Sequence, residues 1–564
     1  MKPSNPLAER FANAGYSATA SRRYGSMTRG AMITSPHYLA TQAGLRVLQA
    51  GGNAIDAAIA VAAVLTVVYP QMCTLGGDAF WLIWNDGAAK LRALNASGRS
   101  AALASREFYT GKGLTSIPPR GYLAANTVPG VVSGWQMASD YSRTTMGSTL
   151  TLADLLADAI RLARDGAPVS TSLAQWLAIN CDRNDSVFRH LQRFQGFAKT
   201  YLKAGELPWQ AGEVLRLPAL AATLSVLAER GLDEFYRGSI AAAIVADVQA
   251  HGGVLRQDDF EQHRADWVEP ISVPYRDAIA YNFPPNTQGM ASLAILNVLN
   301  QFDLRKIAEG SADYYHLLIE ASKQAFVDRD QWLTDPDFID IPLQRLLSND
   351  HGRRQAARIQ MNATARDLQA LDPHGDTVWF GVVDGAGNAV SLIQSIYHDF
   401  GSAIVAGDTG VLLQNRGSFF SLSADAVNRL EPRKRCFHTL NPAMLFKHGK
   451  PYLVYGTMGG EGQPQTQAAI VTRVVDYQMS PAEAIEAPRW LHGRTWGAES
   501  NSTRFESRIS QAVTDEMARR GHPVQRVDAY TDAMGHAGAI LIDPDSKVRF
   551  GASDPRSDGL AAGF

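Results

Sequence analysis

Apolar positions recur at helical spacing in the first part of the chain. The stretch LATQAGLRVLQAGG keeps one apolar face and stops at Gly51-Gly52, a pair that favours the end of a helix. Asn53 fits the N-cap of a second helix, which is almost wholly apolar and runs through Val68. The segments FWLIW and KLRAL follow with strand-like composition. This part of the chain is therefore expected to hold two helices followed by two strands.

The middle of the chain keeps helical spacing. TLADLLADAIRLARDG begins at a Thr and ends at Arg-Asp-Gly, and ADYYHLLIEASKQAFVDRDQW continues the spacing for about six turns. Proline-rich breaks near Pro270–Pro274 and Pro284–Pro285 separate these helical blocks. We expect this region to be mostly helical.

From residue 377 the pattern changes to strands. TVWFGVVD, the turn GAGN and AVSLIQSIY predict a hairpin, and AMLF-KHGK-PYLVYGT predicts a second. PQTQAAIVTRVVDY is helical, and GAILIDPDSKVRFGAS predicts a third hairpin. Sheets covered by helices are the simplest way to bury these elements, so the fold class is α+β or layered α/β.

Composition narrows the class of protein. The 564 residues are 46% hydrophobic and 19% charged, with a net charge of -2, so no basic field favours nucleic acid or an anionic membrane. Cys73, Cys181 and Cys436 are far apart, which suits a reducing compartment. Residues 1–30 are Ser/Arg-rich without an apolar signal segment, and the longest apolar run is too short to span a bilayer. We expect a flexible N-terminal arm over 1–30 and a soluble, cytoplasmic protein.

The pair Asp376-Thr377 leads directly from the loop LDPHGD into a strand. Taken alone, a Thr at this place is an ordinary strand-forming residue. However, HGDTVWFGVVDGAGNAVSLIQSIYHDFGSAIVAGDTG resembles the small-subunit start of the gamma-glutamyltransferases, a family of N-terminal-nucleophile hydrolases. HYLATQAGLRVLQAGGNAIDAAIA, LGGDAFWLIW, YGTMGG and GASDPRSDGLAAGF extend this resemblance over nearly the whole chain in the family's order.

The resemblance implies a layered αββα sandwich and a precursor that cuts itself between Asp376 and Thr377. Residues 31–376 would form a large, mostly helical subunit, and residues 377–564 a strand-rich small subunit, interwoven as one fold. A dimer of such heterodimers is a further assembly that we consider. The implied partner is a small-molecule substrate, with neither nucleic acid nor a membrane.

The residue types suit the implied chemistry. A hydroxyl is a poor nucleophile unless a base lies beside it, and cleavage would free the α-amine of Thr377, whose ordinary pKa of about 8 suits a general base. Backbone N–H groups of Gly459 and Gly460 match the family's oxyanion donors, although a tight turn would also explain this pair. Ser395 falls where the family has a Thr that contacts the nucleophile's amine.

The chain departs from the family where the family binds the amino-acid end of glutathione. In QNRGSFFS, Arg416 replaces a Gln and Phe419 replaces an Asp. His438-Thr439 replaces a serine pair, and Tyr397 replaces an Asn. These substitutions make the expected substrate-binding residues bulkier than those of the family.

Loss of the family's Asp removes the partner of a substrate ammonium, because Phe419 cannot pair with a charge. Arg416 suits a carboxylate through bidentate pairing, with a structural ion pair as the alternative role. The family's large-subunit Arg falls near Ser97, with Arg99 two residues away. The site is thus predicted to take a small acid without an α-amino group.

This variant pattern resembles a branch of the superfamily, the oxamate amidohydrolases of bacterial purine degradation. GDTVWFGVVD, IQSIYHDFGS, LLQNRG, FHTLNPA, YGTMGGEGQPQTQAA, PRWLHGRTWG and AMGHAGAI carry the likeness. It implies that oxamate is converted to oxalate and ammonia through a Thr377 acyl-enzyme, with Arg416 and His438 at the carboxylate.

Three alternatives stay open: a gamma-glutamyl hydrolase or transferase acting on glutathione, an acylase of another small carboxylate amide, and an unprocessed scaffold protein. No HxH, HxxxH or HExxH motif supports a zinc hydrolase, and no glycine pattern supports a nucleotide, so no metal and no organic cofactor are expected. Tyr397-His398-Asp399 does not predict a catalytic pair, because adjacent strand side chains point to opposite faces.

Overall fold

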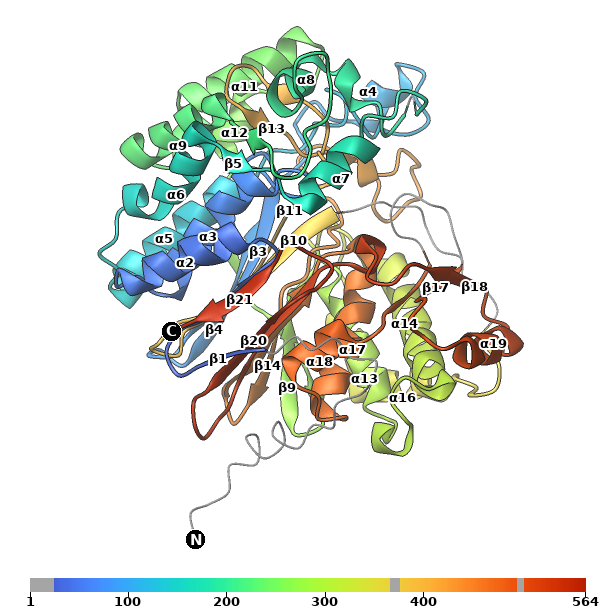
Figure 1. The fold of residues 1–564 in the computed structure, drawn as a ribbon. Helices are drawn as coiled ribbons and strands as arrows, with labels where there is room; N and C mark the ends of the chain where they lie inside the picture. Colours follow the sequence, from blue (N-terminus) through green and yellow to red (C-terminus); the bar gives the residue numbers. More distant parts are fainter. Residues whose placement is uncertain (1–24, 186, 366–375, 494–501) are drawn as a thin grey trace.

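The computed structural model describes residues 25–185, 187–365, 376–493 and 502–564. At its centre two antiparallel seven-stranded sheets pack face to face, and helices cover the outer face of each (Figure 1). The first sheet has the order β1-β20-β19-β15-β14-β9-β8, and the second has the order β21-β2-β10-β11-β3-β4-β7. This is the layered αββα sandwich that the sequence predicts.

Both sheets combine strands that precede residue 377 with strands that follow it. The first sheet contains β1 (Ser26–Thr28), β8 (Ile271–Tyr275), β9 (Ala278–Asn282), β14 (Ala443–Lys447), β15 (Lys450–Thr457), β19 (Ala537–Ile542) and β20 (Arg549–Ser553). The second contains β2 (Met32–Ser35), β3 (Asp78–Asn85), β4 (Lys90–Ala96), β7 (Asp266–Val268), β10 (Asp376–Val383), β11 (Ala389–Tyr397) and β21 (Leu560–Gly563). Smaller sheets pair β5 (Ala167–Pro168) with β6 (Val214–Leu215), β12 (Val405–Ala406) with β13 (Val411–Leu412), and β17 (Thr503–Glu506) with β16 (Trp490–His492) and β18 (Val524–Val527). The two halves of the chain are therefore interwoven.

Three apolar layers hold the sandwich together. Phe80, Trp84, Trp379 and Met444 belong to the layer between the two sheets. The layer outside the second sheet includes side chains of α2 (Tyr38–Gln49), α3 (Ala54–Val68), α5 (Val131–Met146), α6 (Leu152–Asp165), α9 (Pro218–Arg230) and α11 (Ser239–Ala250). The layer outside the first sheet includes side chains of α13 (Gly289–Leu299), α14 (Ala312–Trp332), α17 (Gln463–Val475) and α18 (Pro481–Glu486). Shorter helices are α4 (Arg106–Thr110), α7 (Thr171–Ile179), α8 (Gln195–Tyr201), α10 (Glu234–Arg237), α12 (Gln257–Gln262), α15 (Leu343–Leu346), α16 (Asn349–Ala356) and α19 (Gln511–Arg519).

The residues at the start of α3 explain why this helix begins there, as predicted. The side chain of Asn53 accepts hydrogen bonds from the N–H groups of Ile55 and Asp56, and the Asp56 carboxylate accepts from the Asn53 N–H. This capping box satisfies amide groups that the first turn of α3 cannot pair. Every residue of α3 is buried, which explains its almost continuous apolar sequence.

Two sequence predictions need correction. The proline-rich region between residues 270 and 285 does not only separate helices, because it holds strands β8 and β9. Pro274 is tolerated there because β8 is the edge strand of its sheet and needs no N–H on its open side. In the predicted N-terminal arm, Ser26–Thr28 pair with β20 as strand β1, while residues 1–24 lie outside the described residues. No helix in the described part of the chain is long and apolar enough to cross a membrane.

Candidate active site

Thr377 lies at an irregularity where strands β10 and β11 pair. Asp376 is opposite Tyr397 and Val378 is opposite Gln394, so Thr377 alone faces the two residues Ser395 and Ile396. Such a bulge locally redirects side chains, and bulges are common beside active sites. The Thr377 side chain is fully buried, and its hydroxyl has no hydrogen-bond partner among the described residues. The predicted cleavage bond precedes Thr377, and residues 366–375 and the side chain of Asp376 lie outside what the structure describes.

Ser395 and Tyr397 face this bulge from β11. The Ser395 hydroxyl accepts a hydrogen bond of 2.8 Å from the Tyr397 N–H. Tyr397 has a φ of 82°, a left-handed conformation that is unusual for a bulky side chain and common at functional sites. The bulge thus places Thr377 opposite Ser395 and one residue from the position that faces Tyr397.

Arg416 lies at the start of a short 3-10 helix, Arg416–Phe419, and is 1% exposed. Its guanidinium carbon stacks 3.8 Å from the centre of the Tyr397 ring. The Nη2 atom is 3.5 Å from the Thr439 hydroxyl, and Nε and Nη1 have no hydrogen-bond partner among the described residues. Three predicted substrate-binding residues are therefore in one place: Arg416, Tyr397 and Thr439.

No carboxylate of the described residues forms an ion pair with Arg416, so the alternative of a structural ion pair gains no support. Burial lowers the pKa of its guanidinium, but an arginine keeps its proton in proteins. A buried cation with unpaired donors is costly unless a ligand completes it. Arg416 is thus suited to receive an anion.

His438 is held by a carboxylate that sequence reasoning did not single out. Its Nε2 atom lies 2.8 Å from Oδ2 of Asp78, and both side chains are almost completely buried. The other oxygen, Oδ1, accepts hydrogen bonds from the N–H groups of Gly98 (2.9 Å) and Gly130 (3.1 Å) and from Nε2 of Gln414 (3.0 Å). Asp78 is paired with Ser395 between β3 and β11, which places it one strand from the bulge.

Burial dominates the charge state of this pair. It raises the pKa of Asp78 to about 7, although the hydrogen bonds and the Arg416 charge oppose the shift. Burial first, and then the positive charge of Arg416, hold the pKa of His438 well below its ordinary value. The imidazole is therefore neutral, and its Nδ1 atom has no partner among the described residues. Arg416, rather than His438, supplies positive charge here.

The glycine pair Gly459-Gly460 follows β15 and precedes α17, with φ values of 122° and 53°. Both angles favour glycine, because a side chain would strain this backbone. The side-chain amide of Gln288 donates hydrogen bonds to the carbonyls of Thr439 (2.7 Å) and Gly460 (2.9 Å). Gln288 therefore links the predicted oxyanion loop to the predicted substrate-binding segment.

A buried arginine supports Gln288 in turn. Arg329, on α14, donates from Nη1 to Oε1 of Gln288 (3.2 Å) and forms a 3.2 Å ion pair with Glu461, which follows the glycine pair. Arg329 is 1% exposed, so these contacts support the Gly459-Gly460 loop from the protein interior. The network orients the backbone of Gly460 without contributing a reactive group itself.

Ser97 and Arg99 do not provide the arginine that the family has on its large subunit. Ser97 is buried and donates to Oδ1 of Asn95 (2.6 Å). The Arg99 guanidinium pairs with Asp335 (3.0 Å) and Asp337 (2.6 Å). Arg416 is thus the cation that the structure brings to Tyr397.

Phe419 adds an aromatic ring beside Tyr397. Its ring lies 5.9 Å from that of Tyr397 and 5.0 Å from that of Phe437, measured between centroids. Aromatic rings therefore cluster beside Tyr397 and Phe419.

Sequence reasoning missed Asp78 and Gln288. An acidic residue in the apolar run LGGDAFWLIW was the available signal for Asp78, because a buried charge needs a partner. Gln288 carries no comparable signal. It begins no recognisable motif, and the two carbonyls that its amide binds lie more than 150 residues away in the sequence.

One group of side chains has metal-ligand chemistry. Ligand atoms of His316, Glu320 and His522 lie within 4.8 Å of one another. The sequence motifs did not reveal it, because the residues come from α14 and from the turn after α19. The Glu320 carboxylate already accepts hydrogen bonds from Lys323 and from the Thr364 hydroxyl, and it also accepts from the N–H of residue 365. An ammonium at 3.0 Å makes this carboxylate a poor cation ligand.

Comparison with known proteins agrees with this architecture. The chain is 46% identical over 534 residues to the glutathione hydrolase-like YwrD proenzyme of Bacillus subtilis, covering 94% of this chain and 98% of that protein. It is 44% identical to the oxamate amidohydrolase proenzyme of Klebsiella pneumoniae, with the same coverage of both. The cephalosporin acylase from Bacillus halodurans has a similar structure, with a TM-score of 0.87, 36% identity and 98% of each chain covered.

The profile of a single family accounts for almost the whole sequence. The gamma-glutamyltranspeptidase profile matches residues 40–564, which include every site residue described above. The match, the bulge at Thr377 and the glycine loop lead to one conclusion. The chain belongs to the gamma-glutamyltranspeptidase family.

Proposed function

We propose that this chain is the precursor of an oxamate amidohydrolase, which converts oxamate to oxalate and ammonia in purine degradation. More broadly, it is a hydrolase of the N-terminal-nucleophile type that acts on amides. The observation that carries the proposal is Arg416, a buried guanidinium with two unpaired nitrogen atoms beside Thr439. A small carboxylate would complete these donors with charge-assisted hydrogen bonds.

Maturation begins with the Thr377 hydroxyl. In the proposed step, Oγ attacks the Asp376 carbonyl, the peptide C–N bond breaks, and the acyl group moves from nitrogen to oxygen. Water then hydrolyses the ester and leaves Thr377 with a free α-amine. The products are a large subunit ending at Asp376 and a small subunit of residues 377–564, which stay together because they share both sheets.

Turnover uses the same hydroxyl, with the new α-amine as its base. Oγ attacks the oxamate amide carbon, and the N–H groups of Gly459 and Gly460 stabilise the oxyanion. The amine returns the proton to the leaving nitrogen, so ammonia departs and an oxalyl ester remains on Thr377. Water attacks this ester, which releases oxalate and restores the hydroxyl. One water molecule is consumed for each oxamate.

Specificity follows from charge and size. Arg416 pairs with the substrate carboxylate, and the Thr439 hydroxyl provides a further polar contact. The neutral His438 ring, held by Asp78, adds a polar atom but no charge. Phe419 lies beside Tyr397, where an α-amino group would find no counterion in the side chains of these two residues. A small acid without an amino group therefore fits this site better than a gamma-glutamyl compound.

A second candidate is glutathione hydrolysis. The relative with 46% identity is described as glutathione hydrolase-like, which favours this activity. The same nucleophile and glycine loop would serve it, so the two candidates differ only in substrate recognition. Arg416 favours the first candidate, because its positive charge would repel an ammonium group placed beside it.

The test compares the two substrates on one preparation of processed enzyme. Ammonia release from oxamate and glutamate release from glutathione would be measured over matched concentrations. We expect kcat/KM for oxamate to exceed that for glutathione by about 100-fold or more, since a site without the partner of a charged group discriminates strongly. Higher kcat/KM for glutathione would refute the oxamate assignment and leave the nucleophile assignment intact.

A further inference from the structure

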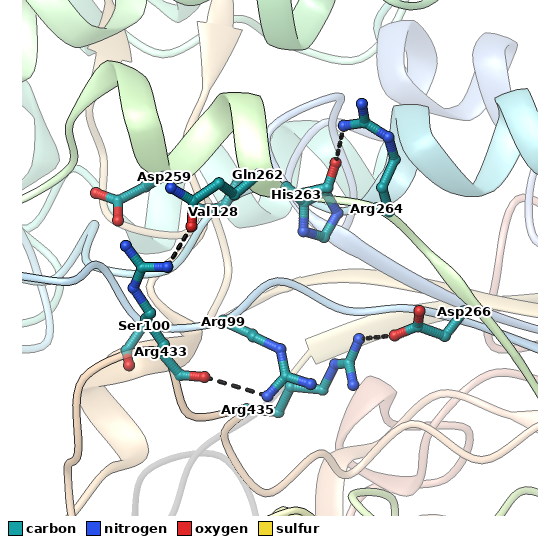
Figure 2. A pocket seen from close by; sticks show the side chains of 10 residues that line it. All are labelled: Arg99, Ser100, Val128, Asp259, Gln262, His263, Arg264, Asp266, Arg433 and Arg435. Carbon is teal, nitrogen blue, oxygen red and sulfur yellow. Dashed lines mark hydrogen bonds and ion pairs between the residues drawn. The ribbon is translucent and has the colours of Figure 1, made fainter.

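A surface pocket of about 440 Å³ lies between the end of β4, the segment after α12 and the segment leading to His438. Four arginines surround it together with a buried histidine (Figure 2). The lining residues used below are Arg99, Arg264, Arg433, Arg435, His263 and Asp259. Neither the proposed nucleophile nor Arg416 belongs to this wall, so the proposed reaction gives this pocket no role.

Only two of the four arginines of this pocket form ion pairs among the described residues. Arg435 pairs with Asp266, and Arg99 pairs with two aspartates outside the pocket wall. Arg433 instead donates to the side-chain oxygen of Gln262, and Arg264 donates to backbone carbonyls. Among the described residues, neither of these two arginines forms an ion pair.

The remaining acid of the wall is already used by the backbone. Oδ1 of Asp259 accepts from the Ala102 N–H (2.9 Å), and Oδ2 accepts from the Arg256 N–H (2.9 Å). These bonds fix Asp259 at the start of α12. Among the described residues, Asp259 forms no ion pair with a guanidinium of the pocket.

His263 provides a second, independent sign of a ligand site. It is 7% exposed, and its Nε2 atom has no hydrogen-bond partner among the described residues. Burial first, and then the charges of Arg435, Arg99 and Arg237, lower its pKa to about 3. Each of these charges is positive, so the ring is neutral in a positive field. Figure 2 shows the ring directed toward the space above Arg99 and Arg435.

We propose that this pocket binds a small oxyanion with two negative charges, of the phosphate or dicarboxylate class. The guanidinium of Arg433 is exposed and can turn toward the ligand, while Arg99 and Arg435 are held in place by their aspartates. A dianion would balance the positive charges of Arg264 and Arg433, which form no ion pair among the described residues. His263 Nε2 would contact it at the inner end.

The pocket shares its wall with the candidate active site. Gly98, which precedes Arg99, donates to Asp78, and Gln414 donates to both Asp78 and the carbonyl of Val128 in the pocket wall. An anion bound here would therefore lie behind the Asp78–His438 pair, separate from the carboxylate position at Arg416.

The test is calorimetric titration of the processed enzyme with inorganic phosphate and, separately, with succinate at constant ionic strength. Arg433→Gln removes an unpaired guanidinium of the pocket. Arg358→Gln is the matched control, because Arg358 is also exposed and forms no ion pair among the described residues. Arg416→Gln tests whether the probe binds in the candidate active site instead.

We expect Arg433→Gln to weaken binding by about tenfold or more, the effect of losing a charge-assisted pair. Arg358→Gln and Arg416→Gln should change it less than twofold. The probe that binds more tightly identifies the ligand class. Binding of neither probe, equal loss in Arg433→Gln and Arg358→Gln, or loss confined to Arg416→Gln would each overturn the proposal.

Discussion

Replacing Arg416 by methionine separates a binding role from a structural one. Methionine keeps much of the volume but removes the charge and all five N–H donors. If Arg416 binds the substrate carboxylate, the variant leaves that carboxylate without a partner in a buried site. Truncating one partner of such a pair costs about 2–5 kcal/mol. The expected fall in kcat/KM for oxamate is roughly 30- to 5000-fold.

The same substitution should not destabilise the fold. Nε and Nη1 of Arg416 are buried without partners among the described residues, and each unmade hydrogen bond costs about 1–3 kcal/mol. Loss of the cation–π contact with Tyr397, worth about 0.5–2 kcal/mol, works in the opposite direction. The free energy of unfolding is therefore expected to stay level or rise, since apolar replacement of an uncompensated buried charge is often stabilising.

Arg473→Met is the matched control for stability. Arg473 is as buried as Arg416 but pairs with Glu309 at 2.8 Å and donates to the carbonyls of Ala484 and Pro488. Its replacement should lower the free energy of unfolding by about 3 kcal/mol. Urea unfolding and oxamate kinetics on both variants provide the assay. If Arg416→Met destabilised the protein as much as Arg473→Met and left oxamate kinetics unchanged, Arg416 would be structural.

Two further predictions concern the surrounding network. Burial raises the pKa of Asp78 to about 7, so the folded protein binds this proton more tightly than the unfolded chain. The proton therefore stabilises the fold in acid, and this contribution is lost as the pH rises from about 4 through 7. In Asp78→Asn, the free energy of unfolding in urea should fall less over this pH range than in the wild type. A decline equal to that of the wild type would contradict the raised pKa of Asp78. Gln288→Ala removes hydrogen bonds to the carbonyls of Thr439 and Gly460 and should lower kcat by about 10- to 100-fold, with a smaller change in KM. Stopped assays over a range of oxamate would show this split, and an effect on KM alone would argue against a role in orienting the oxyanion loop.

Features set by neighbouring residues were predictable from the sequence. The capping box at Asn53 and the apolar run of α3 are local, and so are the turns GAGN and KHGK that join β10 to β11 and β14 to β15. Strand β8 was missed because proline argues against a strand unless it lies at a sheet edge. Edge position is a property of the assembled sheet, which short-range patterns do not contain.

The site prediction missed a contact between residues that are far apart in the sequence. Asp78 and His438 are 360 residues apart and meet only in the assembled sandwich, where β3 belongs to one sheet and the segment with His438 leads into β14 of the other. The resemblance to a known family proposed Thr377, Ser395 and Arg416 as site residues, whereas the partner of His438 could be found only from the fold. The charge state of His438 also depends on the fold, because burial, and then the positive charge of Arg416, hold its pKa well below its ordinary value.

The most direct test of the account is intact mass spectrometry of the purified wild-type protein and of its Thr377→Ala and Thr377→Ser variants. The account predicts two wild-type fragments that meet between Asp376 and Thr377, a single uncut chain for Thr377→Ala, and slow cleavage at the same bond for Thr377→Ser, because serine keeps the hydroxyl. A Thr377→Ala protein cut at this bond, or a wild-type chain that stays whole yet hydrolyses amides, would contradict it.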